Sequence, residues 1–325
     1  MLSRGALTIV DALITGREAT PEELTTDTGY TRDHIYQLLD EMIAAGLLHE
    51  TRRHHNQRVV HITEHPVIEQ YRKLKAEFSH VDWPELLTPA TVRVCWYLDE
   101  PRRITSIADR LGISRQSVHK ALSPLKNRAM LSPAGPEYAL SDSIQPLLEF
   151  IQAVVVHDHQ NRARDFAPST TVEWCDPGRA LIRVQERHDT ESLYAAEEWE
   201  VTGLARFEQF GLQFFLAGEP AFWYAPEETL MPAETVCHTL VLDDGSRRVS
   251  YSLLLIEAEA ISQEELMDVA AWYGLADTIS EIYRYLDEEY KPPSEGKVHL
   301  PDRTKYAALK DQYGVVRGLW NGGQN

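Results

Sequence analysis

Apolar residues in the first half of the chain recur with the 3.6-residue period of half-buried helices. In one stretch the apolar positions are Ile35, Leu38, Leu39 and Met42. In a later stretch the same i, i+3, i+4, i+7 spacing is held by Val118, Ala121, Leu122 and Leu125. The positions between them are mostly polar, so the spacing predicts two amphipathic helices, each with one polar face.

Both patterns belong to a longer internal repeat. Residues Ala19–Leu48 (the first copy) and Ile104–Leu131 (the second copy) align in one constant register. The matching pairs are Leu24 and Ile107, Gly29 and Gly112, Thr31 and Ser114, Arg32 and Arg115, Ile35 and Val118, Leu39 and Leu122, Met42 and Leu125, and Leu48 and Leu131. One unbroken register over this length indicates two copies of one structural unit.

Each copy is predicted to contain two short helices joined by a tight turn. Thr20 or Thr105 opens the first helix, and a glycine of the shared register ends it. Thr31 or Ser114 then follows as the cap of the second helix. Two short helices joined by a glycine turn, the second polar on its outer face, form a helix-turn-helix.

A β-hairpin is predicted after each copy. In residues 47–65, two strands flank a polar turn at His54–Gln57. The basic residues on the shoulders of this turn are Arg52, Arg53 and Arg58. Residues 130–141 form a shorter hairpin that holds no basic side chain.

The order of helix, helix-turn-helix and hairpin resembles the winged-helix family of transcription regulators, in tandem over about residues 1–145. The resemblance implies that the second helix of each copy enters the DNA major groove and that the hairpin touches the backbone or the minor groove. It implies groove-facing roles for Thr31, Arg32, His34, Tyr36 and Gln37 and for Ser114, Arg115, Gln116, Ser117, His119 and Lys120. The candidates for contacts to the backbone are Arg52, Arg53, His54, His55 and Arg58.

These residue types suit contacts with double-stranded DNA. Arginine and glutamine can form paired hydrogen bonds with the edges of guanine and adenine. Asp33 departs from the pattern, and either caps the helix locally or reads cytosine. The second hairpin has no basic residue, so the second copy is expected to bind through its helix alone. The alternative is that these residues form an ordinary solvated helix face and turn.

Two further apolar patterns predict helices that follow the copies. In residues 65–83, apolar side chains at positions 67, 71, 74, 78 and 81 have the spacing of a coiled-coil seam. This seam either pairs two chains or packs across its own domain. Residues 143–166 form a second helix of this kind. We expect a homodimer, because linked modules raise the effective concentration of a DNA binder without added charge.

From residue 167 the pattern changes to that of an α+β domain. The strands expected there are residues 180–186, 214–218, 221–225, 234–242 and 248–258, with a hairpin turn at residues 243–246. Helices are expected at residues 203–211, at 261–290 with a break at Gly274, and after a linker that begins at Lys291. The predicted domains are 1–82 and 83–166 (two winged helices, each with its following helix), 167–290 (an acidic α+β domain) and 291–325 (a tail).

Composition adds a strong asymmetry of charge. The net charge is −18, and 24 of the 32 basic residues are arginines. Residues 1–165 hold 19 basic and 22 acidic side chains, whereas residues 166–325 hold 13 and 28. Any attraction to a polyanion is therefore expected in the first half. The acidic surplus with few lysines resembles the cytosolic proteins of salt-loving archaea, where salt at about 1 M screens charges beyond ~3 Å.

The remaining sequence argues against secretion, membrane insertion and enzymatic activity. There is no leader and no apolar run long enough for a transmembrane helix, and three distant cysteines indicate buried free thiols in a reducing cytoplasm. No glycine-rich phosphate loop, G-x-S-x-G or H-E-x-x-H motif occurs. Cys237 and His238 are expected on opposite faces of a strand, and His54, His55 and His61 lack the spacing of a metal site. No cofactor is expected.

The sequence thus predicts a cytoplasmic, DNA-binding transcription regulator that is not an enzyme. Its C-terminal domain would sense a signal, dimerise or bind a partner protein. One alternative rests on "TGLARFEQFGL" at residues 202–212, which is similar to a segment of abortive-infection antitoxins. That resemblance implies an autoregulatory protein whose last domain counters a nucleotidyltransferase toxin.

Overall fold

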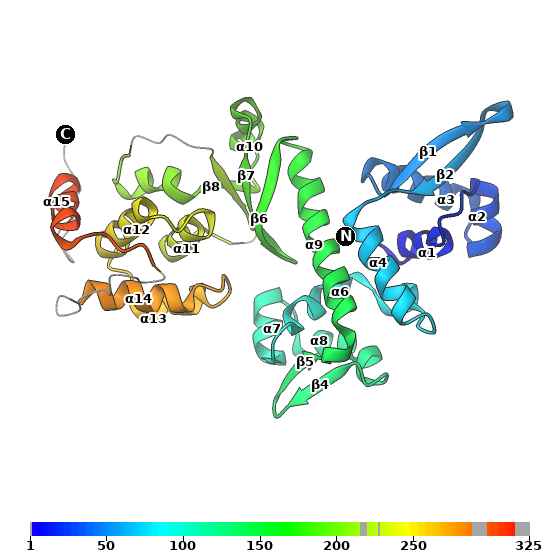
Figure 1. Ribbon diagram of the computed structural model, residues 1–325, viewed down its shortest axis with the longest axis horizontal. Coiled ribbons are helices and arrows are strands. Elements are labelled where there is room, and N and C mark those ends of the chain that lie inside the picture. The colour runs from blue at the N-terminus through cyan, green and yellow to red at the C-terminus, as the bar shows by residue number, and fades with distance from the viewer. Residues whose placement is uncertain (1, 215–219, 227, 288–297, 316–325) are drawn as a thin grey trace. The chain divides into compact units, whose positions relative to one another are not determined.

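The computed structural model describes residues 2–214, 220–226, 228–287 and 298–315 (Figure 1). The chain forms two compact units, Met1–Asn161 and Arg162–Asn325, and the boundary falls in the last turn of helix α9 (Gln145–Arg164). Each unit combines helices with antiparallel strands. The expected mixture of α and β structure is therefore confirmed, while the finer domain boundaries stay predictions.

With the helix before it and the hairpin after it, the first copy folds as three helices and a hairpin, and from here on each copy is taken to include these flanking elements. Its elements are α1 (Arg4–Leu13), α2 (Pro21–Thr28), α3 (Arg32–Ala44), β1 (Leu48–Arg53), the 3-10 helix η1 (His54–Asn56) and β2 (Gln57–Ile62). Helix α2 opens with a capping box, in which the Thr20 N–H donates to Glu23 Oε2 at 2.7 Å and the Glu23 N–H donates to Thr20 Oγ1 at 3.2 Å. The Thr20 N–H and the Thr20 hydroxyl, which donates to the same Oε2 at 3.1 Å, lower the pKa of the Glu23 carboxyl. Thr20 therefore opens the helix as expected.

The second copy repeats this order. Its elements are α6 (Pro89–Cys95), the 3-10 helix η2 (Trp96–Leu98), β3 (Arg102–Arg103), α7 (Ile104–Leu111), α8 (Arg115–Lys126), β4 (Leu131–Ala134) and β5 (Glu137–Leu140). Helix α7 begins and ends at the positions that match the two ends of α2, and α8 begins at the position that matches the start of α3. The two-residue strand β3 pairs with β5. It lies at the position that matches Ala19 in the first copy, where Ala19 forms an isolated β-bridge with Val60 of the hairpin. The internal repeat is confirmed. The expected start at Thr105 is wrong, because β3 leads directly into α7 and Arg103 is its N-cap.

Both second helices end in the same backbone turn. Gly46 (φ 73°) and Ala129 (φ 55°) match in the register of the repeat and occupy the same left-handed position. The next N–H, of Leu47 or Met130, donates to the carbonyl of Met42 at 2.9 Å or of Leu125 at 3.1 Å. A left-handed backbone is free of strain for glycine but not for alanine, so the second copy makes this turn under strain.

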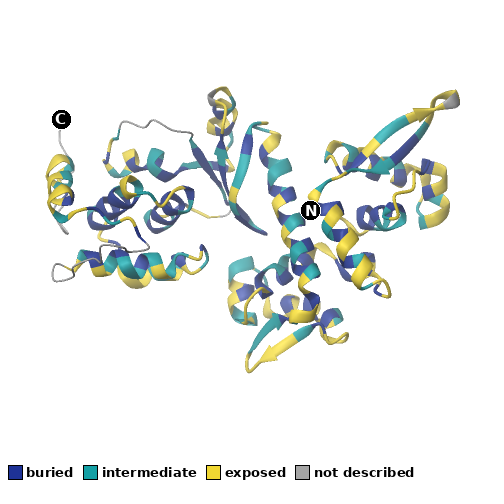
Figure 2. Cartoon of the chain, viewed as in Figure 1, coloured by how far each residue is buried: buried dark blue, intermediate teal, exposed yellow. Residues whose placement is uncertain are grey.

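The apolar stripe of each second helix is buried. Ile35 and Leu39 on α3, and Val118 and Leu125 on α8, have no exposed surface. Buried and exposed positions accordingly alternate around the helices of this unit (Figure 2). Burial of one face leaves the opposite face of α3 and of α8 in solvent, as the periodicity predicted.

The seam of the helix that follows the first copy is buried within the chain itself. Helix α4 (Pro66–Glu77) places Val67, Tyr71 and Leu74 in the core. The Tyr71 ring packs on Phe150 of α9 at 5.4 Å, and its hydroxyl donates to Asp11 Oδ1 at 2.6 Å. Of the two alternatives for this seam, packing within its own unit is therefore the one observed. The predicted helix also ends earlier than expected, and α5 (Trp83–Leu86) follows separately. After the second copy, the 3-10 helix η3 (Asp142–Ile144) leads into α9.

The second unit contains a four-stranded antiparallel sheet in the order β6-β7-β9-β8. Its strands are β6 (Thr170–Asp176), β7 (Arg179–Val184), β8 (Trp199–Thr202) and β9 (Ala221–Tyr224). The strands predicted at 180–186 and 221–225 are confirmed, and β6 and β8 were not predicted. Trp199, Phe222 and Trp223 are buried in the core of this unit.

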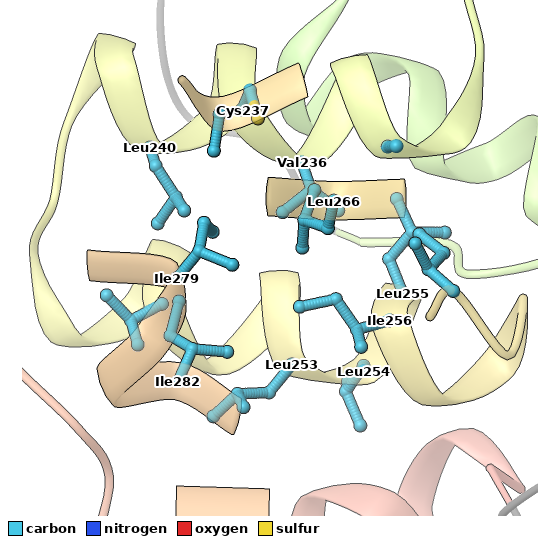
Figure 3. Packing of buried hydrophobic residues seen from close by; sticks show 14 of the residues in the cluster. Val236, Cys237, Leu240, Leu253, Leu254, Leu255, Ile256, Leu266, Ile279 and Ile282 are labelled. Atoms are coloured by element: carbon cyan, nitrogen blue, oxygen red, sulfur yellow. The ribbon is translucent and has the colours of Figure 1, made fainter. Parts of the chain in front are cut away.

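Helices make up the rest of the second unit. They are η4 (Arg187–Asp189), α10 (Thr190–Ala195), the 3-10 helix η5 (Gly203–Phe210), α11 (Pro232–Leu242), α12 (Ser246–Ala258), α13 (Gln263–Ala270), α14 (Ala276–Leu286) and α15 (Arg303–Tyr313). Side chains of α11, α12, α13 and α14 point into one shared core (Figure 3). The helix pair broken at Gly274 and the final helix are confirmed, as is the short helix at 203–211.

Two predicted strands, residues 234–242 and 248–258, are wrong: they are the helices α11 and α12. Both helices are buried around most of their circumference, so their sequences show no amphipathic period, and a short apolar run alone does not separate a strand from a buried helix. The predicted hairpin turn at 243–246 consequently joins two helices. The expected strand at 214–218 and the linker at 291–297 lie largely or wholly outside the described residues.

The described part of the chain contains no helix with the length and apolar character needed to cross a bilayer. All three cysteines are free and buried, as expected. Burial raises the pKa of the Cys175 thiol to about 12, with a contribution from the neighbouring Asp176 carboxylate. Burial likewise raises the pKa of the Cys95 and Cys237 thiols.

The strained turn gives a first prediction. Ala129→Gly is expected to stabilise the chain by about 0.5–1 kcal/mol, because relief of the left-handed strain outweighs the added freedom of the unfolded chain. Gly46→Ala, at the matching position of the first copy, is expected to destabilise it by about 1–2 kcal/mol. Urea unfolding of both variants measures the difference, and a destabilising Ala129→Gly would contradict the prediction.

The cysteines give a second prediction. At about pH 8.5, where an exposed thiol is half ionised, a water-soluble thiol reagent is expected to modify none of the three cysteines in the folded chain. The raised thiol pKa values keep them protonated, and burial keeps the reagent out. The same reagent should modify all three in guanidinium, which serves as the control. Rapid reaction of any cysteine in the native chain would contradict the buried placement.

Candidate nucleic-acid interface

Helix α8 presents the predicted contact residues of the second copy to solvent. Ser114 caps the helix, since the Ser117 N–H donates to Ser114 Oγ at 3.1 Å and the two hydroxyls lie 2.9 Å apart. The buried stripe holds the other side of the helix against the unit. All six predicted residues are exposed, namely Ser114, Arg115, Gln116, Ser117, His119 and Lys120. The structure therefore brings them together on one face.

The charges around α8 are unbalanced. The sequence between Asp109 and Glu137 holds no acidic residue, and it is the longest such run in a chain with 50 acidic side chains. This run holds Arg110, Arg115, Lys120, Lys126 and Arg128. Neither Arg115 nor Lys120 forms an ion pair with any residue that the structure describes. Their charges face solvent without compensation.

The predicted residues of the first copy are also brought to one side of its helix. Thr31, Arg32, His34 and Gln37 on α3 are exposed, and Tyr36 is half-buried. Thr31 stands at the N-cap with an extended backbone, but its hydroxyl makes no capping hydrogen bond, unlike Ser114. The helix therefore exposes these side chains on the side away from its buried stripe.

The arginines that flank α3 are all paired with carboxylates. Arg32 Nη2 lies 3.4 Å from Glu22 Oε1, and Arg58 Nη2 lies 2.6 Å from Asp40 Oδ1. Each of the two guanidinium groups lies 5.5 Å from the centre of the Tyr36 ring. Only 12% of the Arg58 side chain is exposed. The side chain of Arg58 thereby connects the second hairpin strand to α3.

The hairpin arginines are held in the same way. Arg52 and Arg58 stand directly opposite each other on β1 and β2, where like charges repel. Glu50 lies between them, with Oε1 2.7 Å from Arg52 and Oε2 2.8 Å from Arg58. Arg53 is paired with Glu18. The hairpin turn is exposed at His55, while the side chain of His54 is not among those described.

The two copies therefore have opposite charge on a common backbone. Counted with its hairpin, the first copy (residues 18–62) holds 4 basic and 8 acidic residues. The second copy (residues 101–141) holds 7 basic and 2 acidic residues. This difference follows from the residues at matching positions, and the apolar pattern that the copies share does not reveal it.

Two further basic residues belong to the face of the second copy. Lys126 Nζ lies 5.9 Å from the centre of the Tyr138 ring, and the Arg128 guanidinium donates to Pro124 O at 3.1 Å. Both side chains are exposed. The acid-free run from residue 110 to 136 would have identified them. The turn of the second hairpin is exposed and uncharged.

Comparison with known proteins concerns the second unit. A family model described as HVO_2833_C, C-terminal, matches residues 196–315. The match covers about a third of the chain and runs from just before β8 to just after α15. No curated protein matches the chain.

Within the matched segment, one buried histidine is hydrogen-bonded at both ring nitrogens. His238, on α11 and not on a strand as expected, has no exposed surface. Its Nδ1 lies 2.8 Å from Thr202 Oγ1 and its Nε2 lies 2.9 Å from the Tyr273 hydroxyl. Both ring nitrogens are thus engaged by hydroxyls, which makes His238 a packing residue and not a base for Cys237.

A buried carboxylate fixes the last helix of the matched segment. The Tyr306 hydroxyl donates to Glu257 Oε2 at 2.6 Å, and Lys310 Nζ donates to Oε1 at 2.9 Å. Burial and the nearby carboxylate raise the pKa of Tyr306. Among the described residues, no group of three or more His, Cys, Asp or Glu side chains could hold a metal ion.

The paired arginines of the first hairpin give a third prediction. Arg58→Ala is expected to destabilise the chain by about 1–3 kcal/mol, because it leaves the partly buried Glu50 without its partner on β2. Arg52→Ala is the matched control, since this side chain pairs with the same carboxylate but is 53% exposed. Its loss should cost at most about 1 kcal/mol. Equal losses of stability for the two variants, measured by thermal unfolding, would show that the ion pairs of Arg58 stabilise the chain no more than that of Arg52.

Proposed function

We propose that the chain is a sequence-specific regulator that binds double-stranded DNA through two winged helices, with α8 as the principal groove-reading helix. The order of three helices and a hairpin, present in both copies in one register, supports the winged-helix assignment. In that arrangement the second helix of each copy enters the major groove. The exposed polar faces of α3 and α8 are available for this role.

The observation that carries the proposal is the uncompensated positive face of α8. DNA presents a dense row of phosphates, and each basic side chain that neutralises one releases bound counterions. Arg115 and Gln116 in the first turn of α8 are of the types that form paired contacts with guanine and adenine. In a chain of net charge −18, the acid-free run on this helix and its flanks is the region that fits a polyanion.

The second unit would supply regulation. Its excess of acidic residues makes it unsuited to contact DNA, so sensing, dimerisation or binding of a partner protein is the role that we assign to it. The three buried free thiols and the acidic surface support a place in a reducing, salt-rich cytoplasm.

The proposal is tested by mapping bound DNA across the genome in cells and measuring binding of the purified chain to the sites found. Arg115→Ala is expected to weaken specific binding by about 1–3 kcal/mol and to relax the preference at one base pair. Lys120→Ala should weaken binding to all sequences by a similar factor and reduce the salt dependence by about one phosphate contact.

The matched control is the double variant Arg72→Ala and Lys73→Ala, compared with the double variant Arg115→Ala and Lys120→Ala. Arg72 and Lys73 are exposed on α4, and their loss changes the net charge as much as the loss of Arg115 and Lys120. Discrete sites in cells and a loss confined to the α8 variants would support the regulator. An absence of discrete sites, or equal losses in both double variants, would refute it.

A further inference from the structure

The carboxylates of the first copy hold the arginines that would contact DNA. Arg53 is paired with Glu18, Arg58 with Asp40 and Glu50, and Arg52 with Glu50. We refer to Glu18, Asp40 and Glu50 as the guard carboxylates. Asp40 lies on α3, Glu50 on β1 and Glu18 in the loop before α2, so this pairing is a property of the folded copy and not of one local sequence.

The guard carboxylates are peculiar to the first copy. At the matching positions of the repeat, the second copy has Pro101, Ser123 and Pro133 in their place. The basic residue at the start of the second helix is kept in both copies, as Arg32 and Arg115. The difference between the copies therefore lies in the acidic residues as much as in the basic ones.

An ion pair with a carboxylate lowers the binding free energy that an arginine gains when it contacts a DNA phosphate. An unpaired arginine that reaches a phosphate releases the counterions of the DNA, and this release is the main source of binding without sequence preference. A paired arginine must first leave its carboxylate, and the freed carboxylate then lies near the DNA backbone and attracts a cation in turn. The net release of ions for such a contact is close to zero.

We propose that the guard carboxylates suppress binding of the first copy to DNA of arbitrary sequence, so that this copy adds contacts only where α8 has found its site. The inference rests on the proposed function and concerns the selectivity of the same interface. Glu18 is well placed for this, since the adjacent Ala19 is fixed to Val60 by hydrogen bonds of 3.0 and 2.9 Å. Glu50 is held between two arginines on the strand pair.

The test uses the full chain and a labelled random-sequence duplex of about 30 base pairs, titrated from about 50 to 200 mM salt. The variant Glu18→Gln, Asp40→Asn, Glu50→Gln keeps the shape of the side chains but removes their charge. It is expected to bind this duplex more tightly, and the slope of log K against log salt should steepen by up to about 2.7, or about 0.9 for each released phosphate contact. Adding Arg52→Ala and Arg53→Ala should reverse about 1.8 of this change.

The matched control is Glu69→Gln, Glu77→Gln, Glu85→Gln. These three exposed carboxylates lie in the same unit, outside both copies, and their removal changes the net charge by the same amount. Thermal unfolding and circular dichroism establish that each variant is folded. If the guard variant and the control gain affinity equally, the effect is one of net charge and the inference is overturned.

The outcomes separate this inference from the proposed function. In one outcome the guard variant binds the duplex no better than the control does, while the Arg115 and Lys120 variants still lose binding. This result would refute the role of the guard carboxylates and leave the proposed function as a DNA-binding regulator intact. A steeper slope of log K against log salt in the guard variant, with no loss of binding on substitution of Arg115 and Lys120, would support the role of the guard carboxylates. It would refute α8 as the principal groove-reading helix. If no variant binds the random duplex at the lowest salt, the inference about the guard carboxylates is overturned, and the mapping of bound sites in cells decides separately on the regulator.

Discussion

The buried apolar stripe on the second helix of each copy is the constraint on which the candidate interface depends. Each valine, leucine or isoleucine that is fully buried contributes about 1.5–3 kcal/mol relative to an exposed one. An exposed ion pair contributes about 0–1 kcal/mol. The rotation of α3 and α8 about their axes is therefore fixed by residues such as Ile35 and Val118, and the charged side chains occupy the face that remains. The surface offered to a ligand is a consequence of the core.

Because burial of apolar side chains contributes more than exposed ion pairs, the sequence predicted the helices of the first unit better than it predicted its surface. The helical period of the apolar residues, the two left-handed glycines that end the first helices and the shared register of the copies are all visible in the sequence, and each gave an element that the structure contains. The ion pairs are not local. Arg53 and Glu18 are 35 residues apart, and Arg58 and Asp40 are 18 apart, so the sequence placed the arginines on the hairpin but gave no sign of their partners. The sequence therefore predicted which residues lie at the candidate interface, but not which of their charges are neutralised by ion pairs.

In the second unit, prediction failed where burial was complete. Helix α12 buries Leu253, Leu254, Leu255 and Ile256 in succession, so that every side of the helix meets the core and no polar face remains to reveal the period. The same holds for α11, whose buried His238 and Thr239 are satisfied by hydrogen bonds within the unit. A sequence with apolar residues on all sides specifies burial, and length with flanking signals must then decide between helix and strand. Pro232 at the first turn of α11 was such a signal.

The repeat also separates the backbone that the two copies share from the charges that each copy carries on it. The second copy makes the same helices and the same turns with no carboxylate at the positions that match Glu18, Asp40 and Glu50. The second copy also lacks the hairpin arginines, since the positions that match Arg52, Arg53 and Arg58 hold Gly135, Pro136 and Ser141. In the first copy Glu50 stabilises a hairpin that places two arginines opposite each other, and the same pairing changes the charge that this surface offers to a ligand. A surface that the fold leaves free to vary is where two copies of one unit can acquire different partners, or different roles toward one partner.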